Sequence, residues 1–241
     1  RNNQLLSIES TINPGVMLEV VVPILEKRPE LNLHIVHCPE RVNPGDEKWS
    51  VRNIPRVIGG TTKEATRLGK EFYESILDAP VKAMGSVTEA EAVKILENTF
   101  RDINIAFVNE MAKSFDALGI DVKNVIEGAA TKPFAFMPHY PGNGVGGHCI
   151  SVDPYYMIER GRQAGFDHKF LQLARDINNS MPEFTVSLLD RGMQKLDIQK
   201  KPITVALLGL AYKKDIDDIR ESPALEIREL LEQRSDVSLR V

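Results

Sequence analysis

The chain has 241 residues, a formal net charge of −4 and an ordinary share of apolar and charged side chains, so we expect one large or two smaller globular domains with packed cores. This charge supplies no basic surface for a nucleic acid, and no apolar run approaches the roughly 20 residues that a membrane span needs. The two cysteines, Cys38 and Cys149, form no disulfide framework, which favours a reducing, cytoplasmic setting.

The first third of the sequence alternates short apolar segments with helical ones. Strands are predicted at residues 5–8, 31–36, 56–58 and 81–84, and helices at about residues 14–27 and 63–77. This alternation indicates parallel βαβ units. Ligands of open parallel sheets lie beyond the carboxyl ends of the strands. Thr11 and Glu40 follow the first two strands, and they are candidate site residues on position alone.

Residues 87–118 form the longest periodic segment and contain neither glycine nor proline. Apolar side chains occur on several faces of this predicted helix, and such a helix is buried on several faces. We therefore expect it to join domains or to form a homodimer. Lys94, Asn98 and Arg101 share one face. They point into a cleft or form a solvated stripe, and the helix alone leaves both interpretations open.

The rest of the chain begins helical and then returns to an α/β pattern. Helices are predicted at residues 122–130, 153–162 and 169–196, the last broken or kinked at Pro182. Residues 201–202 mark a boundary. Beyond it we predict a strongly buried strand (203–208), a helix (223–233) and the start of another strand (237–241). The predicted fold class is α/β, with domains at residues 1–86, 87–200 and 201–241.

A glycine-rich loop at residues 141–156 contains Cys149, with four glycines just before the thiol, His148 beside it and Asp153 four residues after it. Glycine permits close approach of a ligand to the backbone, so we interpret Cys149 as a nucleophile. The loop also fits G-x-G-x-x-G, but that fingerprint must follow a strand. Two prolines in residues 136–141 disfavour a central strand there.

Other interpretations of the two cysteines have less support in the sequence. Cys38, beside a strand end, is expected to be a buried structural residue. The adjacent pairs His37–Cys38 and His148–Cys149 do not have the usual spacing of zinc ligands, so no metal site is predicted. A His148–Cys149 acyl-transfer dyad is disfavoured because neighbouring side chains on an extended loop point apart.

Six stretches resemble, in order, motifs of the UDP-glucose/GDP-mannose dehydrogenase family. They are residues 9–15, 38–45, 54–60, 90–98, 141–156 and 209–224. The run Gly-Gly-His-Cys-Ile and residues 131–134 look most like the branch that oxidises UDP-N-acetylhexosamines, with the UDP-glucose branch as the alternative. Pro44 stands where the UDP-glucose branch often has a second glutamate.

The resemblance implies an NAD-dependent four-electron oxidation of the C6 hydroxyl of a nucleotide-sugar, a reaction of polysaccharide biosynthesis. Cys149 is then the nucleophile that forms a thiohemiacetal and a thioester. Lys94 and Asn98 stabilise the oxyanion, and Lys94 also transfers protons. Asp153 orients the water or a partner side chain.

The resemblance assigns further roles by position. Glu40 is the acid/base carboxylate of the hydrolysis, and Thr11 holds the attacking water and touches NAD. Arg220 also contacts NAD. The sugar nucleotide is contacted by Arg41, Val42, Arg101, Gly146, Tyr212 and Lys213.

Members of the family begin with a G-x-G-x-x-G strand–turn–helix and end in a nucleotide-binding domain. We therefore expect this chain to be a fragment that is inactive by itself. It holds the tail of a Rossmann-like NAD domain, a central helical dimerisation domain and the start of a second Rossmann-like domain that binds UDP. The alternative is a non-catalytic helical dimerisation module. The sequence does not fix which UDP-sugar is used.

Overall fold

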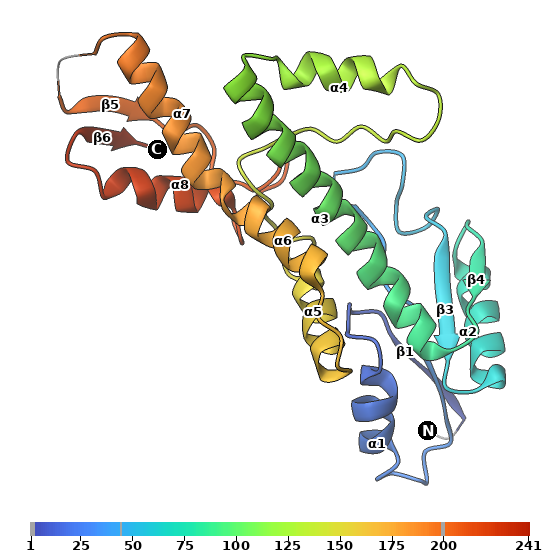
Figure 1. Cartoon of the computed structure of the whole chain (residues 1–241). Helices are drawn as coiled ribbons and strands as arrows, with labels where there is room; N and C mark the ends of the chain where they lie inside the picture. Colours follow the sequence, from blue (N-terminus) through green and yellow to red (C-terminus); the bar gives the residue numbers. More distant parts are fainter. Residues whose placement is uncertain (1–2, 44, 199–200) are drawn as a thin grey trace. The chain divides into compact units, whose positions relative to one another are not determined.

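The computed structural model describes residues 3–43, 45–198 and 201–241, so Pro44 lies outside the described residues. The chain divides into two compact units. Unit 1 holds Arg1–Asn98 and Tyr155–Asp167, and unit 2 holds Thr99–Pro154 and His168–Val241. Figure 1 shows the elements of both units.

The sheet of unit 1 has the order β1 (Gln4–Ile8), β2 (Leu33–His37), β3 (Arg56–Gly60) and β4 (Val81–Ala83) among the described residues. β1 pairs with β2, and β3 with β4, in parallel as predicted. β2 and β3 are antiparallel, so the expectation of parallel pairs throughout is wrong at this point. A parallel pair needs a crossover connection, usually a helix, and the described residues between β2 and β3 contain no helix.

The helix predicted at residues 14–27 is split into a π-helical turn η1 (Met17–Val21) and α1 (Val22–Leu25). Pro23 lies inside this segment and has no N–H to donate to the preceding turn. The Val22 N–H instead bonds the carbonyl of Met17, five residues back. α2 (Lys63–Ile76) begins at Thr62, whose side chain accepts the N–H of Ala65 at 3.0 Å.

Both faces of the sheet in unit 1 are covered by apolar side chains. One core cluster contains Val36 and Ile58 with Ala65 and Tyr73 of α2. The other contains Met17, Ile35 and Val87. Because Ile35 and Val36 are neighbours in β2, they point to opposite faces.

His37 ends β2 and is fully buried, and among the described residues neither of its ring nitrogens has a hydrogen-bond partner. Burial, weakly opposed by the Ile8 backbone, lowers its pKa from 6.5 to about 4. The unfolded chain therefore binds a proton at His37 between these pH values, whereas the folded chain does not. The stability from neutral His37 is complete above pH 6.5 and is lost as the pH falls toward 4.

We expect the titration of His37 to lower the free energy of unfolding by about 2 kcal/mol when the pH falls from 7 to 5. A His37→Leu variant should lose less than the native chain over this interval, because it lacks the titrating group. Urea unfolding at both pH values measures the difference. An equal loss in the two proteins contradicts the assignment to His37.

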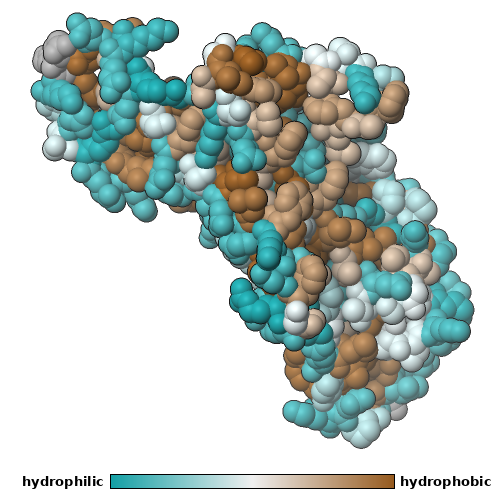
Figure 2. Space-filling model, viewed as in Figure 1, coloured by the Kyte–Doolittle hydropathy of each residue, from teal (hydrophilic) through white to brown (hydrophobic). Residues whose placement is uncertain are grey.

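α3 (Val87–Leu118) has the predicted bounds. Its buried apolar residues include Ile95, Ala106 and Val108. On another side lies a row that we call the α3 stripe, consisting of Leu96, Phe100, Ile103 and Phe107. Leu96, Phe100 and Phe107 are 70%, 49% and 56% exposed, and Figure 2 shows apolar surface along α3. This chain therefore covers only part of the apolar surface of α3.

The remaining helices are α4 (Val122–Ala130), α5 (Asp153–Gln163), α6 (Lys169–Asn179), α7 (Met181–Lys195) and α8 (Pro223–Glu232). The stretch predicted at residues 169–196 breaks at Ser180, because Pro182 lies in the first turn of α7. Among the described residues, no helix is both long and apolar enough to cross a bilayer.

The second sheet pairs β5 (Ile203–Ala206) in parallel with β6 (Val237–Arg240). The expectation that the strand at residues 203–208 is strongly buried is wrong. The strand ends at Ala206, its residues alternate between half-buried and exposed, and Leu208 is 90% exposed. The described part of this sheet has two strands, which leave one face of β5 open to solvent. The α/β class with a parallel-strand sheet, a helical central region and a second sheet is confirmed.

Candidate active site

Glu40 follows β2 and is held as a carboxylate by three donors. Its Oε1 accepts the N–H groups of Arg41 at 2.6 Å and Val42 at 2.7 Å, and its Oε2 accepts Nη2 of the buried Arg56 at 2.5 Å. Burial raises the pKa of Glu40, but these donors and the Arg56 charge outweigh it and hold the pKa below the ordinary value. The group is therefore ionised and fixed in orientation.

Arg41 connects the loop after β2 to α3. Its Nη2 lies 2.5 Å from Oε1 of Glu97 and its Nε 3.2 Å from Oε2, while Nη1 donates to the Pro55 carbonyl at 2.7 Å. Arg41 is predicted to contact the substrate, and in the structure its guanidinium is already paired with Glu97. Glu97 lies on α3 between Lys94 and Asn98, so the loop of Glu40 is tied to the turn that carries both residues.

The loop that carries Thr11 is held at both ends within unit 1. Glu9 accepts the hydroxyl of Tyr73 at 2.6 Å. The buried Glu91 accepts the N–H groups of Gly15 at 2.7 Å and Met17 at 2.8 Å. Burial raises the pKa of Glu91, and the two N–H groups oppose it. Sequence reasoning missed this carboxylate, which ties the Thr11 loop to the start of α3.

Lys94 and Asn98 are half-buried, and Arg101 is exposed. At about 100° per residue, all three lie on the side of α3 opposite the α3 stripe. A continuous helix therefore presents them on one face, as predicted. Lys94 and Asn98 belong to unit 1, together with Thr11, Glu40, Arg41 and Val42, whereas Arg101 belongs to unit 2.

Cys149 lies in unit 2 at the end of the glycine loop, and its side chain is exposed. Its carbonyl accepts the N–H groups of Val152 at 3.2 Å and Asp153 at 2.8 Å, in the turn that leads into α5. Ser151 Oγ donates to the Gly147 carbonyl at 2.5 Å. Asp153 is 2% exposed. Hydrogen bonds of the turn thus fix the backbone that presents the thiol.

The glycines before Cys149 make room for a second segment of the chain. A Cβ on Gly146 would lie 2.6 Å from the Glu221 carbonyl oxygen, and one on Gly147 would lie 2.9 Å from the Tyr212 ring. The Gly147 N–H also donates to the Arg220 carbonyl at 3.1 Å. The sequence predicts that these glycines allow a ligand's close approach, whereas in the structure the space beside Gly146 and Gly147 is occupied by this segment of unit 2.

The same segment carries Tyr212, Lys213 and Arg220. Tyr212 and Lys213 are half-buried. The Arg220 guanidinium is paired with Asp218, with Nη2 and Oδ2 at 2.6 Å, and this pair lowers the pKa of Asp218 to about 2. Unit 2 therefore brings Cys149, Gly146, Tyr212 and Arg220 into one region.

We expect Cys149 to be alkylated well before Cys38. Burial raises the pKa of the Cys38 thiol to about 12, and Cys38 is 0% exposed, so little reactive thiolate is available there. Peptide mapping after limited treatment with iodoacetamide measures both sites. Earlier labelling of Cys38 contradicts the proposed roles of the two cysteines.

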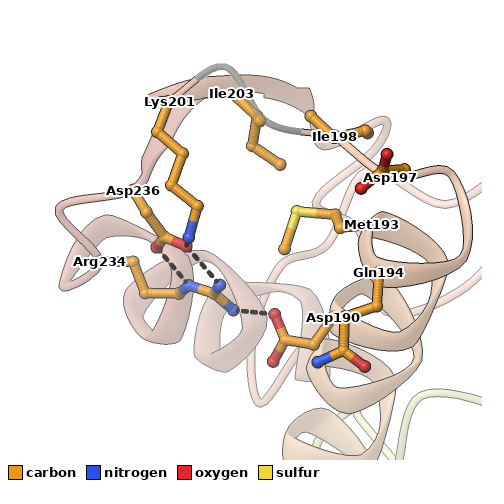
Figure 3. A pocket seen from close by; sticks show the side chains of 9 residues that line it. All are labelled: Asp190, Met193, Gln194, Asp197, Ile198, Lys201, Ile203, Arg234 and Asp236. Carbon is orange, nitrogen blue, oxygen red and sulfur yellow. Dashed lines mark hydrogen bonds and ion pairs between the residues drawn. The ribbon is translucent and has the colours of Figure 1, made fainter.

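A cavity of about 480 Å³ lies elsewhere in unit 2, between the end of α7 and the starts of β5 and β6. In Figure 3 the Arg234 guanidinium bridges Asp190 and Asp236, and Lys201 also reaches Asp236. The cavity lies at the amino ends of the strands, whereas ligands of parallel sheets bind beyond the carboxyl ends. None of the predicted site residues lines it, so the ion pairs there are structural. Among the described residues, no three His, Cys, Asp or Glu side chains gather as a metal-ligand set.

Three profiles of one family match the chain in order. They are the NAD binding domain of the UDP-glucose/GDP-mannose dehydrogenase family at residues 1–77, its central domain at residues 88–180 and its UDP binding domain at residues 206–240.

Curated relatives agree with this match. A UDP-N-acetyl-D-glucosamine 6-dehydrogenase of Pseudomonas aeruginosa is 38% identical, with 99% of this chain and 57% of the relative covered. A UDP-N-acetyl-D-mannosamine dehydrogenase of Methanocaldococcus jannaschii is 39% identical, with 94% and 50% covered. The chain thus spans about half the length of these relatives.

A solved structure of UDP-D-ManNAc dehydrogenase from Pyrococcus horikoshii superposes with a TM-score of 0.88 at 38% identity, covering 98% of this chain and 56% of the solved one. The resemblance that the six sequence motifs predict is confirmed by these matches. The chain belongs to the UDP-glucose/GDP-mannose dehydrogenase family.

Proposed function

We propose that the protein carrying this chain oxidises the C6 hydroxyl of a UDP-N-acetylhexosamine to a carboxylate with NAD as the oxidant. The observation that carries the proposal is the exposed Cys149 at the end of a loop fixed by its own hydrogen bonds. The substrate class rests on relatives named as UDP-N-acetyl-D-glucosamine and UDP-N-acetyl-D-mannosamine dehydrogenases.

Unit 1 offers groups that fit a dinucleotide. The loops after the parallel strands β1 and β2 carry Thr11 and Glu40 at the edge where such ligands bind. Oδ1 of Asn13, beside Thr11, is buried without a hydrogen-bond partner in the described part of the chain, so it can accept a ligand donor. Bound NAD supplies the hydride acceptor for both oxidations. Thr11 and Arg220 are the proposed protein contacts of the cofactor.

Cys149 captures the C6 aldehyde in the proposed mechanism. Its sulfur adds to the carbonyl carbon and forms a thiohemiacetal, whose oxidation gives a thioester. Water then cleaves the C–S bond, which releases the carboxylate and returns the thiol. Covalent capture divides a difficult oxidation into easier steps and retains the aldehyde.

The charged and polar groups around this chemistry have separate roles. Lys94 and Asn98 stabilise the oxyanion that develops on the substrate oxygen, and Lys94 also moves the proton of the C6 hydroxyl. The fixed carboxylate of Glu40 serves the hydrolysis as acid/base group. Thr11 holds the attacking water, and Asp153 orients that water or a partner side chain.

Substrate recognition is proposed for two sets of residues. Arg41, already oriented by Glu97, and Val42 are proposed contacts from the loop after β2. Arg101, Gly146, Tyr212 and Lys213 are the other proposed contacts of the sugar nucleotide. We propose an NAD-binding region at residues 1–86, a central helical region at residues 87–200 and the beginning of a UDP-binding region at residues 201–241, in keeping with the ranges of the family matches. We place the protein in the cytoplasm, where its thiols stay reduced.

We further propose a homodimer that covers the α3 stripe. Three large apolar side chains of this row are each about half or more exposed, and a partner helix would remove them from water. Multi-angle light scattering at micromolar concentration should show twice the chain mass. The Phe107→Glu variant should shift toward the monomer, since a charge in the interface is costly.

The control for this prediction is Phe72→Glu, because Phe72 is an exposed phenylalanine that belongs to α2 and not to the α3 stripe. It should remain dimeric. A monomeric native chain, or equal behaviour of the two variants, contradicts a dimer through α3.

The function is tested with the natural protein that contains these residues at its full natural length. NADH formation is followed with UDP-N-acetylglucosamine, UDP-N-acetylmannosamine and UDP-glucose. We expect the highest kcat/KM with one of the N-acetylhexosamines. A higher value for UDP-glucose contradicts the substrate class, and no NADH with any of the three contradicts the reaction.

A further inference from the structure

A row of buried polar side chains in unit 2 ends at the glycine loop. Arg175 of α6 and Asp102 of α3 form an ion pair, with Nη1 and Oδ1 at 2.6 Å. Asn178 Nδ2 donates to the same oxygen of Asp102 at 2.8 Å. Asn109 Nδ2 donates to Asn178 Oδ1 at 2.9 Å, and the Gly142 N–H donates to Asn109 Oδ1 at 3.0 Å. The four side chains are at most 3% exposed.

The order of donors and acceptors in this row is set from one end. An ionised carboxylate only accepts hydrogen bonds, so Asp102 requires the NH₂ group of Asn178. The oxygen of Asn178 then faces Asn109 and requires the NH₂ group of that residue. The oxygen of Asn109 is thereby turned toward the loop, where it accepts the N–H of Gly142. Reversal of either amide would bring two donors or two acceptors together in a buried site, at a cost of about 1–3 kcal/mol per unsatisfied group.

The loop is held further along by contacts with other parts of unit 2. A Cβ on Gly144 would lie 3.0 Å from Pro223 and 3.3 Å from the Asn178 carbonyl oxygen. The Gly147 N–H bonds the Arg220 carbonyl at 3.1 Å. Gly142 is thus attached to the row of Asp102, Asn178 and Asn109, which we call the amide row, at the start of the segment that leads to Cys149.

We propose that Asp102, Asn178 and Asn109 are positioning residues for the proposed reaction, acting through Gly142 on the loop that presents Cys149. The part of this inference that concerns catalysis rests on the proposed function, whereas the anchoring of the loop does not. The amide row fixes where the loop leaves the helices, and the Gly147 contact fixes the approach to the thiol. Cys149 is then presented by a loop whose backbone N–H groups are bonded at Gly142 and at Gly147.

The anchoring is tested on the 241-residue chain by hydrogen exchange of residues 143–148. Gly142→Pro removes the N–H and leaves the buried side chains in place. Gly142→Ala keeps the N–H, and the added Cβ meets one atom, at 3.8 Å. We expect loop exchange to accelerate about tenfold in Gly142→Pro relative to Gly142→Ala, the effect of losing one hydrogen bond of ordinary strength.

A second pair of variants excludes an effect of proline stiffness. Asn109→Leu removes both hydrogen bonds of Asn109 and should accelerate the same amides. Ser180→Ala removes the bond between Lys113 of α3 and Ser180, the residue that follows α6. This bond does not involve the loop, so the loop amides should exchange at an unchanged rate. If Asn109→Leu does not fold, the two Gly142 variants decide. Equal exchange in Gly142→Pro and Gly142→Ala overturns the proposal.

The positioning role is measured in the natural protein at its full length. Gly142→Pro should lower kcat about tenfold or more relative to Gly142→Ala, because small misplacements of a reacting group are costly. The KM for NAD should change less than about twofold, because the proposed cofactor contact Thr11 lies outside the altered segment and the guanidinium of the other proposed contact, Arg220, is held by its pair with Asp218. An unchanged kcat with accelerated exchange overturns the positioning role. An inactive native protein refutes the proposed function and leaves the exchange result standing.

Discussion

Replacement of Arg175 by methionine is expected to lower the unfolding free energy of the chain by about 3–5 kcal/mol, because it leaves Asp102 as a buried charge without its cation. Arg175 and Asp102 have side-chain exposures of 3% and 1%. Burial already raises the pKa of Asp102, and Arg175 opposes that rise. The loss in the variant should therefore shrink in acid, where Asp102 takes up a proton. Urea unfolding at neutral and acid pH measures both effects.

The control for this experiment is Arg191→Met. Arg191 and Asp116 form an ion pair with 2.5 Å between Nη2 and Oδ2, but their side chains are 50% and 37% exposed. Solvated pairs of this kind contribute about 0–1 kcal/mol. Equal losses from the two substitutions contradict the view that the buried pair anchors the helices of unit 2.

Replacement of Cys149 by alanine is expected to lower uronic acid formation by about three orders of magnitude or more, because no other group of the proposed site can form the thioester. Product is quantified by mass spectrometry after incubation of the natural full-length protein with NAD and a UDP-N-acetylhexosamine. Circular dichroism verifies that the variant is folded.

The matched control is Cys38→Ala, which removes the other thiol. Cys38 is 0% exposed and packs in the core beside Tyr73, so its loss should reduce stability and leave turnover close to the native value. Turnover that survives the loss of Cys149, or that disappears with Cys38, contradicts the covalent mechanism.

Elements with strong local signals could be predicted from the sequence. α3 and α4 have the predicted bounds, because side chains mark both starts. Ser86 Oγ accepts the Glu89 N–H, and Asp121 accepts the N–H groups of Lys123 and Asn124. The antiparallel β2–β3 pair and the exposure of β5 depend on contacts between distant segments. Local periodicity carries no information about those contacts.

Some features of the candidate site could likewise be predicted from the local sequence, and others could not. An exposed Cys149 at the end of a glycine loop follows from the local sequence, whereas the reason for Gly146 and Gly147 does not, because the segment that fills their space is more than sixty residues away. Glu91 and Asn109 were also missed, and their partners lie 76 and 69 residues away. The sequence did contain one signal for these two residues. Glu91 and Asn109 are polar residues on the side of α3 that carries the buried Ile95 and Ala106, and a buried polar group requires a hydrogen-bond partner.

The central claim is a four-electron oxidation of a UDP-N-acetylhexosamine through Cys149. Its most direct test is the amount of NADH formed per UDP-sugar consumed by the natural full-length protein, with the product identified by mass spectrometry. The mechanism predicts two NADH per sugar and a UDP-N-acetylhexosaminuronic acid, with no free aldehyde. One NADH per sugar with release of the aldehyde would contradict it.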